Sequence, residues 1–323
     1  MLRNLLSFLL LFLTLAVQAQ KNFTYTPENP KPGDVVSFTY EPAGDIANTL
    51  LPVDGVVYQI GATGRKADDL VMERKSGKFT GSFTIDPNMN FVYFAFSADK
   101  KFDNNYNEGY TILLNENGKP LSGAYFNKAS YYQYLGPQQA GIEASNEKAL
   151  ANMEKEIELY PANKSKYLYS YVRLQGTLKK DEAQRIYQKE IEALLRSGLK
   201  EETDYSNLES LYQLSKSPEQ SKFIASLKKE KFPNGSWTIT EAVNKFYAEK
   251  DIEKKKQLLK DLLQKADNGG DSWKSIRDNA GSYKMRIAYA YAANKEWDNV
   301  KKAVAESGVT DKSEIAGIYN NTA

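Results

Sequence analysis

The stretch KFTGSFTI, residues 78–85, sets the pattern for the first part of the chain. Phe79, Phe83 and Ile85 fall on one face of a two-residue period, and hydroxyl residues fall on the other. A strand with this pattern buries one side only. The segment therefore predicts a sheet with one face in a core and one face in solvent.

Similar stretches, rich in β-branched and aromatic residues, lie on both sides of this segment. They cover residues 23–25, 35–40, 56–60, 69–72, 91–96 and 110–114. Turn residues such as Pro32-Gly33-Asp34 and Asn117-Gly118 separate them. About seven short strands in roughly 110 residues are typical of an antiparallel β-sandwich. We predict such a sandwich over residues 20–135.

Beyond residue 144 the apolar residues recur at helical spacing. They form stripes over residues 149–160 and 183–195, and Ser217-Pro218 begins a further helix that we expect to bury Phe223, Ile224 and Leu227. Helices of roughly 10–20 residues with short loops indicate stacked helical hairpins. We therefore predict an α-helical domain over residues 145–323, joined to the sandwich by a linker at 136–144.

The stretch IAYAYAANKEWDNVKKAV, residues 287–304, resembles the inter-helix half of a tetratricopeptide repeat. Its small residues let two helices approach closely, and Trp297 after the turn fills the space between them. We predict a degenerate tetratricopeptide-like array, with an irregular helical bundle as the alternative. Ile315, Ile318 and Tyr319 begin another apolar stripe without an evident partner, so we expect the array to be open-ended.

The first nineteen residues, MLRNLLSFLLLFLTLAVQA, have the pattern of a secretory signal peptide. Arg3 supplies a positive start, an apolar run follows, and Ala19 is a small residue before the expected cleavage site at Gln20. A retained anchor is the alternative, but the run is shorter than the ~20 residues needed to span a bilayer. We expect a periplasmic chain, or a secreted or cell-surface one, without a membrane span after cleavage.

Composition excludes most catalytic chemistry, because the 323 residues contain no cysteine and no histidine. A cysteine nucleophile, a Ser-His relay and a Cys/His zinc cage are therefore impossible. Lys and Arg number 43 against 41 Asp and Glu, a balance too even for a nucleic-acid or membrane-surface footprint. The short basic runs at 179–180 and 254–256 are interpreted as solvated. We expect no enzyme activity, no cofactor, no metal and no nucleic-acid partner.

Carboxylates are the remaining strong acid–base groups, and Asp99, Asp103 and Glu108 follow the strand at 91–96. Two such groups could hydrolyse a glycosidic bond. Residues 99–108 could also offer oxygen ligands to calcium, although the spacing D-x-[DN]-x-[DN]-G is missing. A solvated turn is the interpretation that we prefer.

One aromatic cluster is a candidate for partner binding. It consists of Tyr125, Phe126, Tyr131, Tyr132 and Tyr134. Rings with a polar tip suit protein or sugar surfaces, because the ring stacks while the hydroxyl stays in water. The same residues suit a junction between domains, which is the interpretation that we favour over an exposed binding site.

The order of motifs in the first part of the chain resembles a known family. The motifs are FTYTPENPKPGD at 23–34, FTYEPAG at 38–44, GSF at 81–83, DNN at 103–105, GY at 109–110 and GKP at 118–120. This order is similar to the immunoglobulin-like amino-terminal module of exported thioredoxin-like thiol-disulfide oxidoreductases. The resemblance implies an immunoglobulin-like sandwich, then a tetratricopeptide-like region, then a thioredoxin fold with Trp-Cys-x-x-Cys. It covers residues 20–323.

None of that family's catalytic residues can be carried over, because they lie in the thioredoxin fold and this chain has no cysteine. The resemblance therefore implies a non-catalytic accessory or scaffold region of a periplasmic disulfide-exchange protein. Its partner would be another protein or a covalently linked thioredoxin-like domain. The alternative is a free-standing periplasmic or surface binding module for glycans or peptides.

Overall fold

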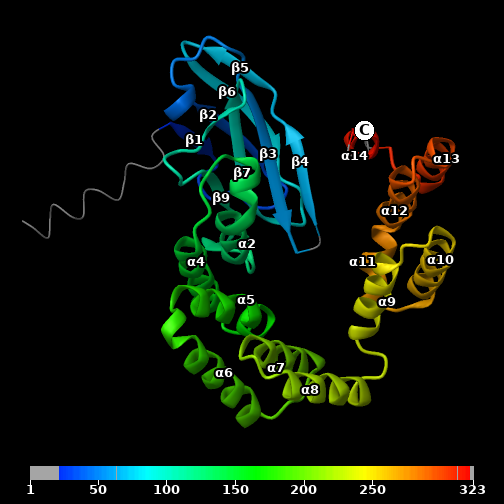
Figure 1. Cartoon of the computed structure of the whole chain (residues 1–323). Helices are drawn as coiled ribbons and strands as arrows, with labels where there is room; N and C mark the ends of the chain where they lie inside the picture. Colours follow the sequence, from blue (N-terminus) through cyan, green and yellow to red (C-terminus); the bar gives the residue numbers. More distant parts are fainter. Residues whose placement is uncertain (1–21, 63, 311, 321–323) are drawn as a thin grey trace, which may run out of the picture. The chain divides into compact units, whose positions relative to one another are not determined.

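The computed structural model describes residues 22–62, 64–310 and 312–320 (Figure 1). An antiparallel β-sheet region comes first and a helical region follows, as predicted. The chain divides into two compact units. The first comprises the chain up to Gly198 together with Ser210–Ser217, and the second comprises Leu199–Glu209 together with the chain from Pro218 onward. The signal peptide expected at residues 1–19 lies outside the described residues.

The first sheet has the one-sided pattern predicted from residues 78–85. Its strands, in spatial order, are β1 Phe23–Thr26, β2 Val35–Tyr40, β6 Lys78–Thr84 and β5 Met72–Lys75. On β6, Phe79 is buried and Phe83 packs against the same core, whereas Thr80 and Ser82 are exposed. The prediction for this strand is confirmed.

The second sheet differs, because its central strand is buried on both faces. The strands are β4 Arg65–Asp69, β3 Asp54–Gly61, β7 Met89–Ala98, β8 Lys101–Asp103 and β9 Tyr110–Leu113. Every residue of β7 from Asn90 to Phe96 is buried, whichever face it points to. The strand expected at 69–72 is instead a crossover, since Leu70 and Val71 carry the chain from β4 in this sheet to β5 in the first.

An aromatic core fills the space between the two sheets. Phe23 lies 4.7 Å from Phe94 between ring centres, and Tyr40 stacks on Phe96 at 3.7 Å and 9°. Such ring pairs contribute beyond the area that they bury. This core, to which Tyr110 of β9 also belongs, forms without any disulfide.

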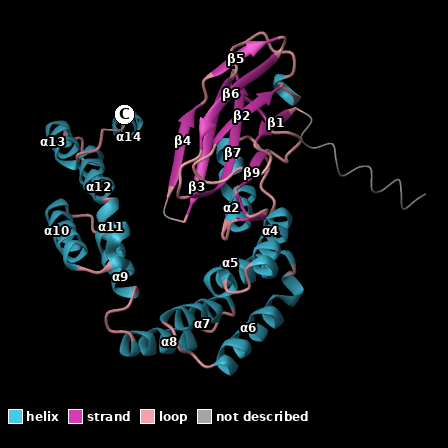
Figure 2. Cartoon of the chain, turned by 180° about the vertical axis from the view of Figure 1, so that it is seen from behind, coloured by secondary structure: helices cyan, strands magenta, loops and turns pink. Residues whose placement is uncertain are grey.

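A second core covers the outer face of the β7 sheet with helical chain. The covering elements are α2 Ala124–Ser130, a π-helical turn Tyr131–Leu135 and α3 Gly136–Gln139. Figure 2 shows α2 beside β7 and β9, and the cluster joins Ile60, Phe91 and Tyr93 of the sheet to Tyr131. The sheets and the first helices therefore share one folded unit.

This second core corrects the expected linker at residues 136–144. Residues 136–139 are helical, Ala140 and Ile142 are buried in the cluster, and the Tyr93 hydroxyl donates to Gln139. The first unit therefore continues past residue 135. The physical reason is that the outer face of β7 is apolar and must be covered.

The remaining helices of the first unit follow the predicted stripes. They are α4 Asn146–Leu159, α5 Asn163–Leu178 and α6 Ala183–Ser197. Ser145 caps α4 by accepting from the Lys148 amide at 3.1 Å, and α6 is followed by Gly198 at a φ of 73°. Buried Ala149 and Met153 confirm the first stripe.

The second unit contains helices only in its described part. They are α8 Pro218–Lys231, α9 Trp237–Ala248, α10 Ile252–Asn268, α11 Lys274–Asp278, α12 Ala280–Ala293, α13 Trp297–Ser307 and α14 Lys312–Asn320, with α7 Glu202–Leu214 shared between the units. All three tryptophans of the chain, Trp237, Trp273 and Trp297, belong to this unit.

Three expectations for these helices need correction. Phe223 was expected to be buried but is 63 % exposed, because α8 turns Ile224 inward instead. The stripe on α14 has a partner, since Ile318 is fully buried in the cluster formed with α12 and α13. Trp297 is 37 % exposed and stacks on Tyr319 rather than filling the space between α12 and α13.

The helix pair predicted at residues 287–304 is present, because α12 and α13 pack against each other with Ala288, Ala292 and Ala303 in the shared cluster. Small residues permit this close approach. Across the described chain, every helix is too short or too polar to cross a bilayer.

Candidate functional site

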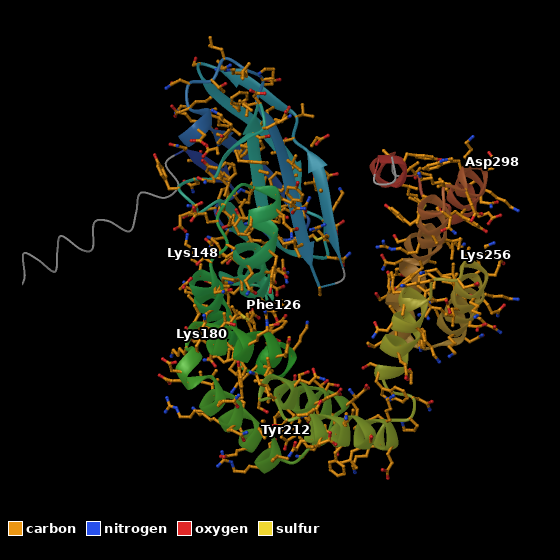
Figure 3. All side chains as sticks on the ribbon, viewed as in Figure 1. Phe126, Lys148, Lys180, Tyr212, Lys256 and Asp298 are labelled. Carbon is orange, nitrogen blue, oxygen red and sulfur yellow. The ribbon has the colours of Figure 1, made fainter. Side chains whose placement is uncertain are left out.

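The five aromatic residues of the predicted cluster differ in burial and in the residues that they contact. Tyr131 and Tyr132 are buried, and Tyr131 lies 4.9 Å from Tyr93 between ring centres. Phe126, labelled in Figure 3, stacks on Tyr167 of α5 at 3.8 Å and 8°. These three residues pack the helices against the sheet and against one another.

Tyr125 and Tyr134 lie nearer the surface. The Lys155 ammonium is 5.7 Å from the centre of the Tyr125 ring, and the Arg173 guanidinium donates to the Tyr134 hydroxyl. Tyr134 is 46 % exposed, so it is the most accessible ring of the five. The cluster as a whole matches internal packing better than a continuous binding face.

Burial also determines the protonation state of the two buried tyrosines, Tyr131 and Tyr132. It raises the pKa of Tyr131 and Tyr132 well above the ordinary tyrosine value, and the nearby Glu108 carboxylate raises both further. The two hydroxyls therefore stay neutral at physiological pH. They have no ready role as general bases.

Asp103 occupies a structural position rather than a catalytic one. Its carboxylate is 3 % exposed and accepts from the Tyr40 hydroxyl at 2.8 Å and the Tyr110 hydroxyl at 2.9 Å. The amides of Ala43 and Asn105 donate to it at 2.8 and 3.1 Å. With four donors on its two oxygens, the carboxylate joins strands β2 and β9 to the segments at Ala43 and Asn105.

Asp99 and Glu108 do not converge with Asp103 on one site. Asp99 is exposed in the turn between β7 and β8, whereas Glu108 pairs with Lys148 of α4 at 2.9 Å. Among the described residues, no three acidic side chains are grouped so that they could share a metal ion. The arrangement therefore favours neither the two-carboxylate hydrolase nor the calcium loop.

The loop at residues 104–109 fastens the sheet to the helical chain. Lys148, labelled in Figure 3, also donates to the Asn107 carbonyl at 2.8 Å, and the Asn107 side chain accepts from the Glu143 amide at 3.1 Å. Gly109 has a φ of +65°, and a Cβ there would lie 1.8 Å from the Tyr131 hydroxyl oxygen. Only glycine permits this approach.

A different candidate lies in the second unit, where α10, α12 and α13 enclose a hollow of about 330 Å³. Apolar residues form its floor and charged residues form its rim. The lining residues are Lys256, Leu259, Lys260, Leu263, Lys284, Ile287, Ala303 and Glu306. We call this feature the lysine-rimmed hollow.

Sequence reasoning missed the lysine-rimmed hollow, because Lys256 belongs to a basic run interpreted as solvated. A usable signal exists on α10: Lys256 and Lys260 are four residues apart, as are Leu259 and Leu263. Residues at this spacing lie on one helix face, so each lysine is placed beside a leucine. The contributions of Lys284 and Glu306 depend on tertiary packing and have no sequence signal.

Comparison with family models, with curated proteins and with solved structures returned no match for this chain.

Proposed function

We propose that this chain is a non-catalytic accessory or scaffold region of an exported, periplasmic thioredoxin-like disulfide-exchange protein. In this proposal the two sheets are an immunoglobulin-like sandwich, and the later helices are a degenerate tetratricopeptide-like array. The region positions a catalytic domain or holds a protein partner. The motif order between residues 23 and 120 supports the family, and the coarse order of antiparallel sheets followed by helices is compatible with it.

The observation that carries the scaffold role is the core shared by the β7 sheet and the helical chain. Phe91 and Tyr93 pack directly on Tyr131, and the Glu108–Lys148 ion pair fastens the adjoining loop. A positioning region needs parts that do not move independently, and a continuous apolar core provides this. The first helices therefore extend rigidly from the sheets.

The chemistry of the side chains supports a non-catalytic role. Disulfide exchange proceeds through thiolate attack, and the chain offers no thiol. Asp103, one of the three acidic candidates, is buried and accepts hydrogen bonds from four donors. We expect purified protein to reduce insulin no faster than the dithiothreitol background.

The accessory role is tested by reading the gene beyond the codon for Ala323. An in-frame thioredoxin-like domain with Cys-x-x-Cys supports the proposal, and an immediate stop codon contradicts it. Export is tested separately by the intact mass of secreted protein, which should begin at Gln20. A mass that retains residues 1–19 contradicts signal cleavage.

The second candidate is a free-standing binding module, and the lysine-rimmed hollow favours peptides as its ligand. As first predicted, this alternative used the tyrosine cluster for glycans or peptides, but Tyr131 and Tyr132 are buried and only Tyr134 of the five is exposed. An immediate stop after Ala323, together with peptide binding at the hollow, would favour this candidate over the accessory region.

A further inference from the structure

We propose that the lysine-rimmed hollow binds an acidic peptide segment of a protein partner, with one apolar side chain in the hollow and carboxylates on the lysines. The inference rests on the proposed partner-holding function and names the chemistry of the partner. Lys256, labelled in Figure 3, marks the position of the hollow on α10.

The floor of the hollow provides the site for the apolar side chain. Leu259, Ile287 and Ala303 are almost fully buried, and half-buried Leu263 completes the lining. At about 330 Å³ the hollow is at the lower end of the range for ligand sites, roughly 300–1,000 Å³. Single apolar anchors that fill such depressions often dominate the affinity of an interface.

The rim provides the charge complementarity. Three lysines, Lys256, Lys260 and Lys284, line the hollow together with one acidic residue, Glu306. Within the described chain, the ammonium groups of Lys260 and Lys284 make no hydrogen bond or ion pair. Two cations are therefore free to pair with an incoming anion.

The other two rim charges are already held in place. The Lys256 ammonium donates to Glu253 at 2.8 Å and lies 5.0 Å from the centre of the Tyr291 ring. Glu306 is 4.0 Å from Lys302, which is not part of the lining. The rim thus keeps an excess of positive charge over an apolar floor.

This combination points to a peptide. A nucleic-acid backbone would leave the apolar floor unfilled, and the chain's net charge of +2 gives no broad basic surface. A single fatty acid has one carboxylate, whereas the lysines stand on two helices and are spaced along the rim. Several carboxylates on one chain, flanking an apolar side chain, supply anions to more than one lysine and an apolar group to the floor.

The probe is the end-blocked heptapeptide EEELEEE, titrated calorimetrically into the full chain at low salt. We expect saturable binding that weakens with added salt, since exposed charge pairs are screened. The matched peptides EEEAEEE and KKKLKKK should each bind roughly tenfold more weakly or not at all. Dodecanoate is the small-molecule comparison.

The protein variants are Lys260→Glu and Lys284→Glu, with Lys301→Glu as the charge-matched control on α13. Lys301 is exposed and does not line the hollow. We expect each of the first two variants to weaken EEELEEE binding roughly tenfold and the control to leave it unchanged. Circular dichroism of every variant shows whether it is folded. Lys260→Ser removes the positive charge without reversing it, so lost binding can be distinguished from lost folding.

Several results would overturn the proposal. These are no binding of EEELEEE, equal binding of EEELEEE and EEEAEEE, an equal effect of Lys301→Glu, or binding of dodecanoate alone. Failure here leaves the accessory role standing if a Cys-x-x-Cys domain is encoded downstream. Conversely, a stop codon after Ala323 defeats the accessory role without affecting the peptide measurement.

Discussion

The two sheets of the first unit are both antiparallel, yet they bury different numbers of faces. The β1-β2-β6-β5 sheet packs one face inward and presents Thr80 and Ser82 to solvent on the other. The β4-β3-β7-β8 sheet packs Phe94 against the first sheet and Phe91 against the helical chain. The comparison shows that the two sheets share one core, whereas the outer face of the β7 sheet is covered by helical chain.

The residue patterns of strands β6 and β7 account for this difference. Residues 78–85 alternate between apolar and hydroxyl side chains, whereas FVYFAF at 91–96 is continuously apolar. Alternation is typical of a strand with one wet face, and a continuous run is typical of a strand that is covered on both faces. A continuous apolar run in an apparent sandwich therefore indicates a third layer.

The largest expected effect comes from removing that third layer. A fragment of residues 22–122, which ends before α2, should fail to fold cooperatively, because it exposes Phe91, Tyr93 and Ala95 to water. A fragment of residues 22–217, which keeps the helices of the first unit, should unfold in one transition. Urea titration followed by circular dichroism measures both. Cooperative unfolding of the shorter fragment would show that the sandwich is autonomous.

Alkaline pH should destabilise both cores, since burial and the Asp103 carboxylate also raise the pKa of Tyr40 and Tyr110 in the inter-sheet core. Burial raises the pKa of Tyr93, Tyr131 and Tyr132, so these groups lose protons near pH 10 only when unfolded. The free energy of unfolding is therefore constant below pH 10. Above pH 10 it decreases by about 1.4 kcal/mol per pH unit for each group.

Urea midpoints at pH 8 and pH 11 test this alkaline loss. Tyr131→Phe is the matched variant, because the Tyr131 hydroxyl is buried without a hydrogen-bond partner. It should leave the pH 8 midpoint nearly unchanged and should reduce the loss at pH 11. Equal midpoints at the two pH values for the unaltered chain would contradict the expected linkage.

Substitution of single core rings should lower the free energy of unfolding by amounts that follow how fully each ring is buried. Phe91→Ala should lower the free energy of unfolding by about 3–5 kcal/mol, because the ring is fully buried between sheet and helices. Phe83→Ala should cost less, about 1–3 kcal/mol, because this ring is only partly buried at the edge of the inter-sheet core. Chemical unfolding of the full chain gives both values. The reverse order would show that Phe83 is packed more tightly than its partial burial indicates.

The smallest effect should come from the solvent face of the first sheet. Thr80→Ala should change the free energy of unfolding by less than about 0.5 kcal/mol, since Thr80 is exposed and its neighbour across β2 is Thr39. Thermal melts of the two proteins provide the measurement. A loss above about 1 kcal/mol would indicate that another part of the molecule covers this face.

The predictable parts of the fold are those with regular periodicity. The alternation of residues 78–85 and the stripe containing Ala149 and Met153 both predict the observed elements. Strand β4 has the sequence RKADD and no apolar alternation, because it is an edge strand whose side chains are largely exposed. Its pairing with β3 comes from tertiary context, which a local pattern does not contain.

The candidate sites were less predictable than the fold. Asp103 is expected in a loop, and its burial depends on Tyr40, which is 63 residues away in the chain, and on Tyr110 of β9. Residues 136–144 are rich in Gly, Pro and Gln, which indicates a linker, yet Ile142 completes a core. The lysine-rimmed hollow requires three helices to meet, and only the α10 part is visible in sequence.

The placement of every tryptophan in the second unit gives the protein two built-in optical reporters. Light at 295 nm excites indole and not neutral phenol, so tryptophan emission follows the unit that holds Trp237, Trp273 and Trp297. Far-ultraviolet ellipticity, in contrast, follows both units, and the sheet contribution belongs to the first alone. Unfolding curves from the two signals, recorded on one unlabelled sample, therefore measure whether the units melt together or in sequence.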